Sequence, residues 1–265
     1  MPPENPQLAD NEAHVWAMTL AIERPILEKL ASTLAPEEKE RANRFKFEHL
    51  RNRYIAGRGA LRAILSQYLE TEATALRFDY LENGKPLLAG EFATAGIHFN
   101  LAHTGDLALM AITRIGRVGV DVEWARPIKN VDELVARFFS KREDELFQKV
   151  SARQKPVAFF NLWTRKEALL KATGEGITRS LNLVEVSFLP GEPARLLAIA
   201  GDEKAAERWM LKEFAPAKEF AGAVAIEAGT SNTEWETSNI QHPTSNTQLK
   251  DRELVVKCWE WAHES

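Results

Sequence analysis

The sequence predicts an α+β fold, and the grouping of its expected elements is the first observation behind this prediction. Helices and strands occupy the first part of the chain, and a strand, several helices and further strands follow in the second. A doubly wound sheet would instead alternate strand and helix throughout. The second observation is a long stretch, residues 53–69, whose apolar side chains recur at helical spacing. The third is a set of short runs typical of strands.

The first part of the chain begins with polar residues 1–12 and ends near residues 114–117. Pro36, followed by acidic residues, marks a helix start, because proline suits the first helical turn and the helix dipole favours acids there. Asn83-Gly84 is a turn signal before Lys85-Pro86. The strands predicted in this part are 14–22 and a hairpin of 97–101 with 107–113, around Thr104-Gly105-Asp106.

The second part opens with a strand over residues 118–123. Valines at 118, 120 and 122 alternate with Gly119, Asp121 and Glu123, so a period of two places both acids on one face. Helices are predicted over 131–171. The last strand candidates are residues 183–189 and 221–226.

The C-terminal segment contains a repeat. Thr-Ser-Asn occurs at 230, 237 and 244, but the seven-residue units have no consistently apolar positions and Pro243 interrupts them, which excludes a coiled coil. The segment is expected to be a polar linker or an insertion with little apolar surface to fold around. A short docked helix is predicted over 249–263, which contains Leu254, Val255, Trp259 and Trp261.

Composition narrows the class of protein. The chain has 265 residues, 45% hydrophobic and 27% charged, which is enough for one large domain or two small ones. A single cysteine, Cys258, excludes a disulfide framework and indicates a reducing compartment. No secretion signal or membrane-spanning run is visible, so we expect a cytoplasmic protein without a membrane partner. The net charge of −4 argues against a general nucleic-acid binder.

Positive charge is concentrated locally instead. Residues 39–62 contain eight basic side chains against two glutamates; the basic ones are Lys39, Arg41, Arg44, Lys46, Arg51, Arg53, Arg58 and Arg62. Each alone can be explained as part of a solvated helix face. As a cluster they suit an anionic ligand.

Three carboxylates and a lysine occur where a metal-bound phosphate reaction needs them. Asp121 and Glu123 share a strand face, while Glu167 and Lys171 fall four residues apart on one helical face. Alternatively, Asp121 and Glu123 belong to the solvent-exposed face of an edge strand, and Glu167 forms an ordinary surface ion pair with Lys171. A bound cation would explain how clustered carboxylates coexist.

The strand G-V-D-V-E and the helix W-T-R-K-E-A together resemble the 4′-phosphopantetheinyl transferases of the Sfp type. The resemblance runs from about residue 36 to 188, and more weakly to 226. Further matches occur in family order: Arg44-Phe45, Arg53-Tyr54-Ile55-Ala56-Gly57-Arg58, Asn83-Gly84-Lys85-Pro86, His98-Phe99-Asn100-Leu101-Ala102-His103-Thr104, Arg137-Phe138-Phe139-Ser140 and Lys171-Ala172-Thr173-Gly174-Glu175-Gly176.

The resemblance implies two similar α+β halves in a pseudo-twofold arrangement, with the active site in the cleft between them. Direct repetition between the halves is not visible in the sequence. We expect an N-terminal half at residues 1–115, a C-terminal half at 116–228, and the tail at 229–265. One chain would then supply both walls of the cleft, which favours a monomer.

The reaction that the resemblance implies moves the 4′-phosphopantetheine arm of coenzyme A to a serine of an acyl- or peptidyl-carrier protein. This is holo-[acyl-carrier-protein] synthase chemistry, and it releases adenosine 3′,5′-bisphosphate. Asp121, Glu123 and Glu167 would hold Mg²⁺, with Mn²⁺ equally open. Glu167 would serve as metal ligand, as general base, or as both. Lys166 and Lys171 would face the pyrophosphate and stabilise the leaving group.

The resemblance also assigns contacts to coenzyme A. His103 would contact the cofactor's phosphates, Arg53 and Arg58 would grip the 3′-phosphate, and Lys85 with Pro86 would line the adenine pocket. Trp163 would face the core and orient its helix. Two positions depart from the family pattern: Ala102 replaces a serine, and Glu38 stands where some members carry a basic residue.

Carrier docking is expected on residues 131–149. The candidates there are Arg137, Phe138, Phe139, Lys141, Arg142 and Leu146. Deletion from Gly229 onward is expected to leave transfer unchanged. Two other classes remain open: a catalytically silent carrier-binding module, and another metal-dependent phosphotransferase or phosphohydrolase.

Overall fold

The computed structural model describes residues 6–174, 181–228 and 255–261, and its elements repeat one order twice. The first half consists of β1 (Glu12–Thr19), α1 (Arg24–Thr33), α2 (Pro36–Asn43), α3 (Glu48–Tyr68), β2 (Phe78–Tyr80), β3 (Pro86–Leu88), the 3₁₀ turn η1 (Gly90–Phe92), β4 (His98–Thr104) and β5 (Leu107–Thr113). The second consists of β6 (Val118–Trp124), α4 (Val131–Phe138), α5 (Lys141–Phe147), α6 (Lys155–Thr173), β7 (Val184–Val186), β8 (Leu196–Ile199), α7 (Glu203–Ala206), β9 (Trp209–Phe214) and β10 (Phe220–Glu227).

The two main sheets share one topology. In the first, β1 pairs antiparallel with β5, and β5 pairs antiparallel with β4. In the second, β6 pairs antiparallel with β10, and β10 with β9. Each half thus has a first strand beside its last, a long helix between them in the chain, and a small two-stranded sheet, β2–β3 or β7–β8. The predicted α+β fold with two similar halves is confirmed.

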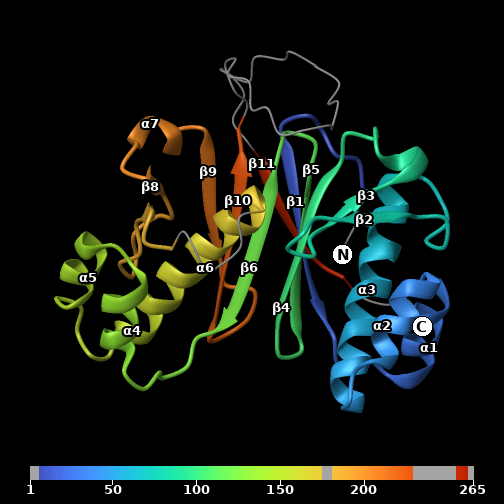
Figure 1. The fold of residues 1–265 in the computed structure, drawn as a ribbon, viewed down its shortest axis with the longest axis horizontal. Coiled ribbons are helices and arrows are strands. Elements are labelled where there is room, and N and C mark those ends of the chain that lie inside the picture. The colour runs from blue at the N-terminus through green and yellow to red at the C-terminus, as the bar shows by residue number, and fades with distance from the viewer. Residues whose placement is uncertain (1–5, 175–180, 229–254, 262–265) are drawn as a thin grey trace.

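The layers follow from which faces are apolar. In Figure 1 the helix α3 covers the outer side of the first sheet and α6 covers that of the second. Between the sheets lies a shared core in which the three valines of β6 contact residues of β1 and β5. The valine face predicted for residues 118–123 is therefore the contact between the two halves. This shared core includes Val15, Leu109, Val118, Val120 and Val122.

The other face of β6 touches α6 closely at Gly119. A Cβ atom at this position would lie 2.0 Å from Ala168 O and 2.3 Å from Ala172 N. Only glycine permits this approach of strand to helix backbone. A side-chain bond also joins the halves, because Asn100 of β4 accepts from the backbone N–H of Val120 at 2.9 Å. These contacts fix where the acidic face of β6 lies.

Most sequence-based elements are confirmed within a few residues. The helices α1 and α7 and the strands β2, β3, β8 and β9 were not predicted. Proline begins α2 as expected, and α6 ends at Gly174, whose φ of 80° is the left-handed conformation that glycine adopts easily.

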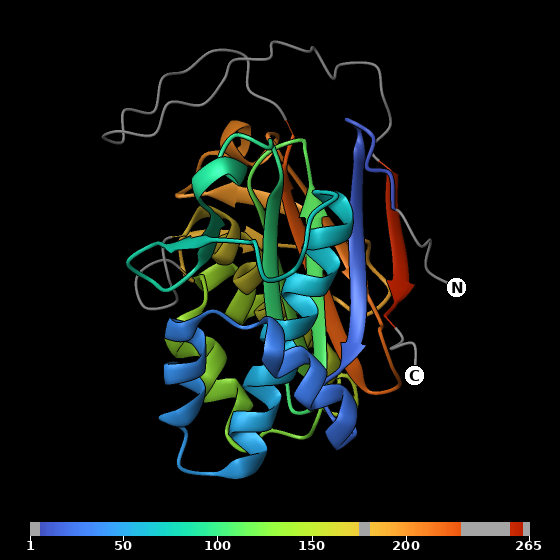
Figure 2. The same ribbon diagram turned by 90° about the vertical axis from the view of Figure 1, so that its right-hand side faces the viewer.

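The short C-terminal helix predicted over 249–263 is wrong in the described part of that segment. Residues Val255–Glu260 form a strand, β11, which pairs in parallel with β1 (Figure 2). Trp259 packs against the rings of Trp16 and His14, and Lys257 forms an ion pair with Glu12 at 2.5 Å. β-branched and aromatic residues favour a strand where a sheet edge is available. The Thr-Ser-Asn repeats lie outside the described residues.

None of the helices in the described ranges has the length and apolar character needed to cross a lipid bilayer.

Candidate active site

The carboxylates predicted to bind a metal meet where β6 packs on α6. Asp121 and Glu123 share the strand face of Gly119, which is the face that touches the helix. Lys171, one turn after Glu167, donates from Nζ to Asp121 Oδ1 at 2.5 Å. Asp121 and Glu167 are 5% and 2% exposed, whereas the Lys171 side chain is 32% exposed. The strand and the helix thus bring these groups together as predicted.

Burial raises the pKa values of all three carboxylates, and neighbouring acids add to the rise for Glu167 and Glu123. Burial, and then the charges of Asp121 and Glu123, raise the pKa of Glu167 to about 7, although Lys171 acts in the opposite direction. Burial raises the pKa of Asp121 against the same lysine. Burial and Asp121 raise the pKa of Glu123. The three acids therefore share a site in which added positive charge is stabilising.

The donor set suits a divalent cation. Asp121 Oδ2 and Glu167 Oε1 are buried and have no hydrogen-bond partner. Buried carboxylate oxygens without donors are ready ligands for a hard cation. Within the described ranges no three His, Cys, Asp or Glu side chains form a complete metal cage. Mg²⁺ does not need one, because it usually keeps water and substrate phosphate among its ligands.

The first half contributes a polar edge beside this cluster. Thr104, at the end of β4, donates from Oγ1 to Glu123 Oε2 at 3.0 Å. The His103 side chain is exposed at the surface. Its pKa is lowered, first because the protein around the ring displaces part of its water and then because of the positive charges of Lys171 and Arg53. Arg53, near the start of α3, pairs through Nε with Asp106 at 2.7 Å and stays 28% exposed. His103 and Arg53 thus lie within electrostatic reach of the second half.

Two family models match the chain on either side of this junction. The model for the 4′-phosphopantetheinyl transferase superfamily matches residues 117–225, and the model for the N-terminal part of a 4′-phosphopantetheinyl transferase matches residues 23–114. The 4′-phosphopantetheinyl transferase HetI of Nostoc sp. is 42% identical over 224 residues, which cover 84% of this chain and 91% of the relative. The chain belongs to the 4′-phosphopantetheinyl transferase superfamily.

Other relatives are more distant. The 4′-phosphopantetheinyl transferase Sfp of Bacillus subtilis is 30% identical over 160 residues, covering 60% of this chain and 68% of the relative. The solved holo-[acyl-carrier-protein] synthase of Thermotoga maritima is 20% identical, with a TM-score of 0.32, and the match covers 43% of this chain and 64% of that chain. The resemblance inferred from the sequence motifs is confirmed by the family matches.

Lys166 points away from the carboxylates in this phosphopantetheinyl transferase, so its predicted contact with the pyrophosphate gains no support from the structure. Its side chain is fully buried, donates to Glu143 Oε2 at 2.5 Å and Leu181 O at 2.7 Å, and lies 4.8 Å from the centre of the Phe139 ring. Successive helix residues are about 100° apart, so Glu167 can face β6 only if Lys166 turns toward the core. Helical spacing alone therefore predicts that Lys166 and Glu167 face different directions, whereas the motif resemblance placed both at the active site.

Arg58 is also committed elsewhere. Its side chain is 8% exposed, lies 3.3 Å from Glu38 Oε1, and donates to the Tyr80 hydroxyl. Arg62 pairs with the same carboxylate at 2.7 Å. Glu38 is therefore the buried counter-ion of two members of the basic cluster, which explains an acid at this position. The structure does not offer Arg58 to a 3′-phosphate.

The Lys85 side chain binds backbone carbonyls of the second half, and the described residues give no support to its predicted place in an adenine pocket. Its Nζ donates to Val118 O at 3.0 Å, Lys171 O at 2.7 Å and Ala172 O at 3.3 Å. Burial, then the charge of Arg117, lowers its pKa to about 8. Pro86, which follows, begins β3 opposite Tyr80. The Lys85 ammonium is thus bound to backbone carbonyls of the second half.

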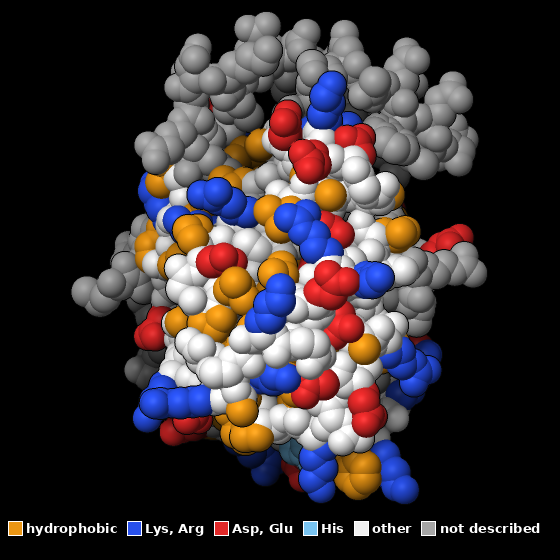
Figure 3. Space-filling model, turned by 90° about the vertical axis from the view of Figure 1, so that its left-hand side faces the viewer, with side chains coloured by type: hydrophobic (Ala, Val, Ile, Leu, Met, Phe, Trp, Pro, Cys, Tyr) orange, Lys and Arg blue, Asp and Glu red, His pale blue; other side chains and the backbone are white. Residues whose placement is uncertain are grey.

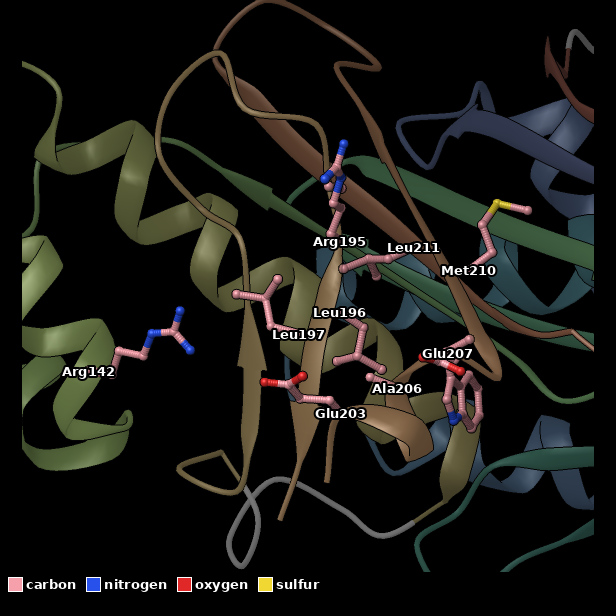
Figure 4. A pocket seen from close by; sticks show the side chains of 11 residues that line it. Arg142, Arg195, Leu196, Leu197, Glu203, Ala206, Glu207, Met210 and Leu211 are labelled. Carbon is pink, nitrogen blue, oxygen red and sulfur yellow. The ribbon is translucent and has the colours of Figure 1, made fainter. Parts of the chain in front are cut away.

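A cavity of about 460 Å³ opens beside Glu123. Aromatic and aliphatic side chains form most of its wall, together with two basic residues; the lining includes Glu123, Arg126, Lys129, Phe138, Phe159 and Trp163. Trp163 is thus partly in the core, as predicted, and partly in this wall. A second cavity of about 520 Å³ lies on β8, α7 and β9, away from the carboxylates (Figure 4). It has no part in the site described here.

The helices predicted to dock the carrier expose some of the candidate side chains and bury another. Phe138 and Leu146 are 38% and 37% exposed, but Phe139 is a core residue. Arg142 is exposed and lies 3.3 Å from Glu185. Figure 3 shows basic, acidic and apolar side chains interspersed on this side of the molecule.

Sequence reasoning did not predict the side-chain contacts that Glu143, Thr104, Asn100 and Asn83 make. Ser140-x-x-Glu143 is a capping-box pattern, so the sequence carried a signal for Glu143 as a helix cap. Nothing in the sequence indicated its pairing with Lys166, which depends on how α5 packs on α6.

Proposed function

We propose that this chain transfers the 4′-phosphopantetheine arm of coenzyme A to a serine of an acyl- or peptidyl-carrier protein. The observation that supports this most is the meeting of Asp121, Glu123, Glu167 and Lys171 in a member of this superfamily. An intact site argues against a catalytically silent carrier-binding module.

The serine oxygen forms a bond to the β-phosphorus of coenzyme A, and the bond from that phosphorus to the bridging oxygen breaks. Adenosine 3′,5′-bisphosphate leaves, and the serine proton goes to a base. Glu167 suits this role, because its buried carboxylate has an oxygen, Oε1, that accepts no hydrogen bond from the protein. Lys171 supplies positive charge beside the leaving phosphate.

Asp121, Glu123 and Glu167 would hold a divalent cation, Mg²⁺ or Mn²⁺. Such an ion would neutralise the diphosphate that otherwise repels an incoming oxygen. The buried, unpartnered oxygens of Asp121 and Glu167 support this assignment. Thr104 orients Glu123 from the other half.

Arg53 and His103 would contact the phosphates of coenzyme A from the first half. Arg53 is partly exposed and carries one carboxylate partner, so a phosphate can compete for its remaining N–H groups. The apolar cavity beside Glu123 would accommodate the pantetheine arm. Phe138, which lines this cavity, and Trp124, which follows Glu123 in the chain, are exposed and would contact the carrier protein.

We further propose a monomer acting in the cytoplasm. Both walls of the site come from one chain. Neither point is needed for the chemistry.

Intact-mass measurement of an apo carrier protein tests the function. After incubation with the transferase, coenzyme A and Mg²⁺, the carrier should gain the mass of one phosphopantetheine arm. Asp121→Ala should lose the transfer, whereas Glu203→Ala, an exposed-acid control on α7, should retain it. Release of inorganic phosphate without a mass gain would instead indicate a phosphohydrolase.

A further inference from the structure

The turn Asn83-Gly84-Lys85 of the first half reaches the end of α6 in the second. Lys85 places its ammonium between the first residue of β6 and the last turn of α6. Asn83 Nδ2 donates to Gly174 O, just past the helix, at 2.9 Å. Two side chains of one turn thus bind four carbonyl oxygens of the other half.

These carbonyls belong to a helix end that needs partners. The last four carbonyls of an α-helix have no donor within the helix, and the helix dipole places partial negative charge there. The ammonium of Lys85 satisfies the carbonyls of Lys171 and Ala172 and complements the dipole. Its third bond, to Val118 O, ties the same point to β6.

The point that Lys85 joins is next to the carboxylates. Gly119 and Asp121 follow Val118 on β6, and Glu167 lies one turn before Lys171, whose carbonyl Lys85 binds. The distance between Asp121 and Glu167 therefore depends on how β6 and α6 are held together.

The Lys85 ammonium is committed to these backbone carbonyls. All three of its bonds go to them, and burial lowers its pKa to about 8. Burying an ammonium without a counter-ion is costly, so these bonds must offset that cost.

The clamp continues into the first half. Tyr80, on the same β2–β3 hairpin, accepts a hydrogen bond from Arg58 of α3, and Arg58 pairs with Glu38. The hairpin is thus anchored to α3, which also carries Arg53. A continuous set of contacts runs from α3 through the hairpin to α6.

We propose that Lys85 is a positioning residue. Together with Asn83, it holds the end of α6 against β6, so that the carboxylates of these two elements are correctly placed to bind one divalent cation. It acts through backbone carbonyls and not through contact with coenzyme A. This inference rests on the proposed function, since it concerns the geometry of that site.

Lys85→Met tests the proposal, with Lys155→Met as the matched control at the opposite end of the same helix, where Lys155 pairs with Asp132. Outer-shell partners of metal sites are typically worth about 10- to 100-fold in metal affinity. We therefore expect Lys85→Met to weaken Mn²⁺ binding about tenfold by titration and to lower kcat about tenfold or more. The KM for coenzyme A should stay within about threefold, and Lys155→Met should change neither quantity.

A raised KM for coenzyme A with unchanged Mn²⁺ affinity would overturn the proposal and give Lys85 a direct contact with the cofactor. Unchanged values throughout would overturn it as well. If Lys85→Met does not fold, Asn83→Ala serves instead, because Asn83 is exposed and its side chain makes two bonds, one to Gly174 O and one from the Lys85 backbone N–H within the same turn. It should accelerate amide hydrogen exchange in the last turn of α6 and weaken Mn²⁺ binding two- to fivefold; no change in either would refute the clamp. Mn²⁺ affinity and hydrogen exchange are measured without transfer, so failure of the proposed function would show separately, in the unmodified protein.

Discussion

Replacing Glu167 by glutamine should stabilise the metal-free protein above neutral pH while abolishing transfer. The unfolded chain ionises this carboxyl near 4.5, whereas burial, Asp121 and Glu123 raise its pKa to about 7 in the folded state. The folded state therefore binds more protons between these values, and stability falls as the pH rises through this window. The cost is absent below about 4.5 and complete above about 7.

The magnitude follows from the same two values. Their difference corresponds to at most about 3 kcal/mol at pH 8. For a chain of this size each kcal/mol moves the melting temperature by about 2–4 °C. We expect Glu167→Gln to melt several degrees above the unmodified protein at pH 8 in the presence of a chelator, and the difference to vanish near pH 4.5.

Differential scanning calorimetry across pH 4.5–8.5 measures this, with Glu145→Gln as a control at an exposed glutamate of α5. Added Mg²⁺ should raise the melting temperature of the unmodified protein more than that of Glu167→Gln, because a ligand stabilises the state that binds it. If Glu167→Gln melts below the unmodified protein at pH 8 without metal, the carboxylate is stabilised in the folded state and the reasoning is refuted.

Three further predictions concern positions outside the reaction itself. Lys166→Met should lower the free energy of unfolding by about 3–5 kcal/mol by leaving Glu143 buried without its partner, and Lys166→Met/Glu143→Gln should recover most of that loss; a folded double variant whose kcat falls a hundredfold would return Lys166 to the active site. Gly119→Ala should cost about 1–3 kcal/mol or more and weaken Mn²⁺ binding, since the new methyl meets backbone atoms of α6; unchanged melting and binding would contradict the close contact. Truncation after residue 228 should cost about 2 kcal/mol through the lost packing of Trp259 on Trp16, with transfer retained below the lowered melting temperature; an unchanged melting temperature would mean that β11 contributes nothing.

The sequence predicted the parts of the site that depend on local periodicity. Alternation along residues 118–123 placed Asp121 and Glu123 on one face, and helical spacing placed Glu167 beside Lys171. Both are confirmed, because a strand and a helix repeat their geometry whatever surrounds them. The paired topology of the two halves has no counterpart in repeated residues, so it was predicted only from the family resemblance.

Roles that depend on tertiary contacts were predicted less well. Lys166, Arg58 and Lys85 are cationic residues in the right motifs, and each is bound to a partner far away in the chain: Glu143, Glu38 and the end of α6. Charge type alone cannot show which partner a long side chain reaches. The strand β11 was missed for the same reason, since its conformation depends on the free edge of β1.

A crystal structure with coenzyme A and Mn²⁺, located by its anomalous scattering, tests the central claim most directly. The account predicts one ion within coordination distance of Asp121, Glu123 and Glu167, with Lys171 near the diphosphate and Lys166 still bound to Glu143. An ion held elsewhere, or Lys166 turned from Glu143 to the phosphates, would contradict it.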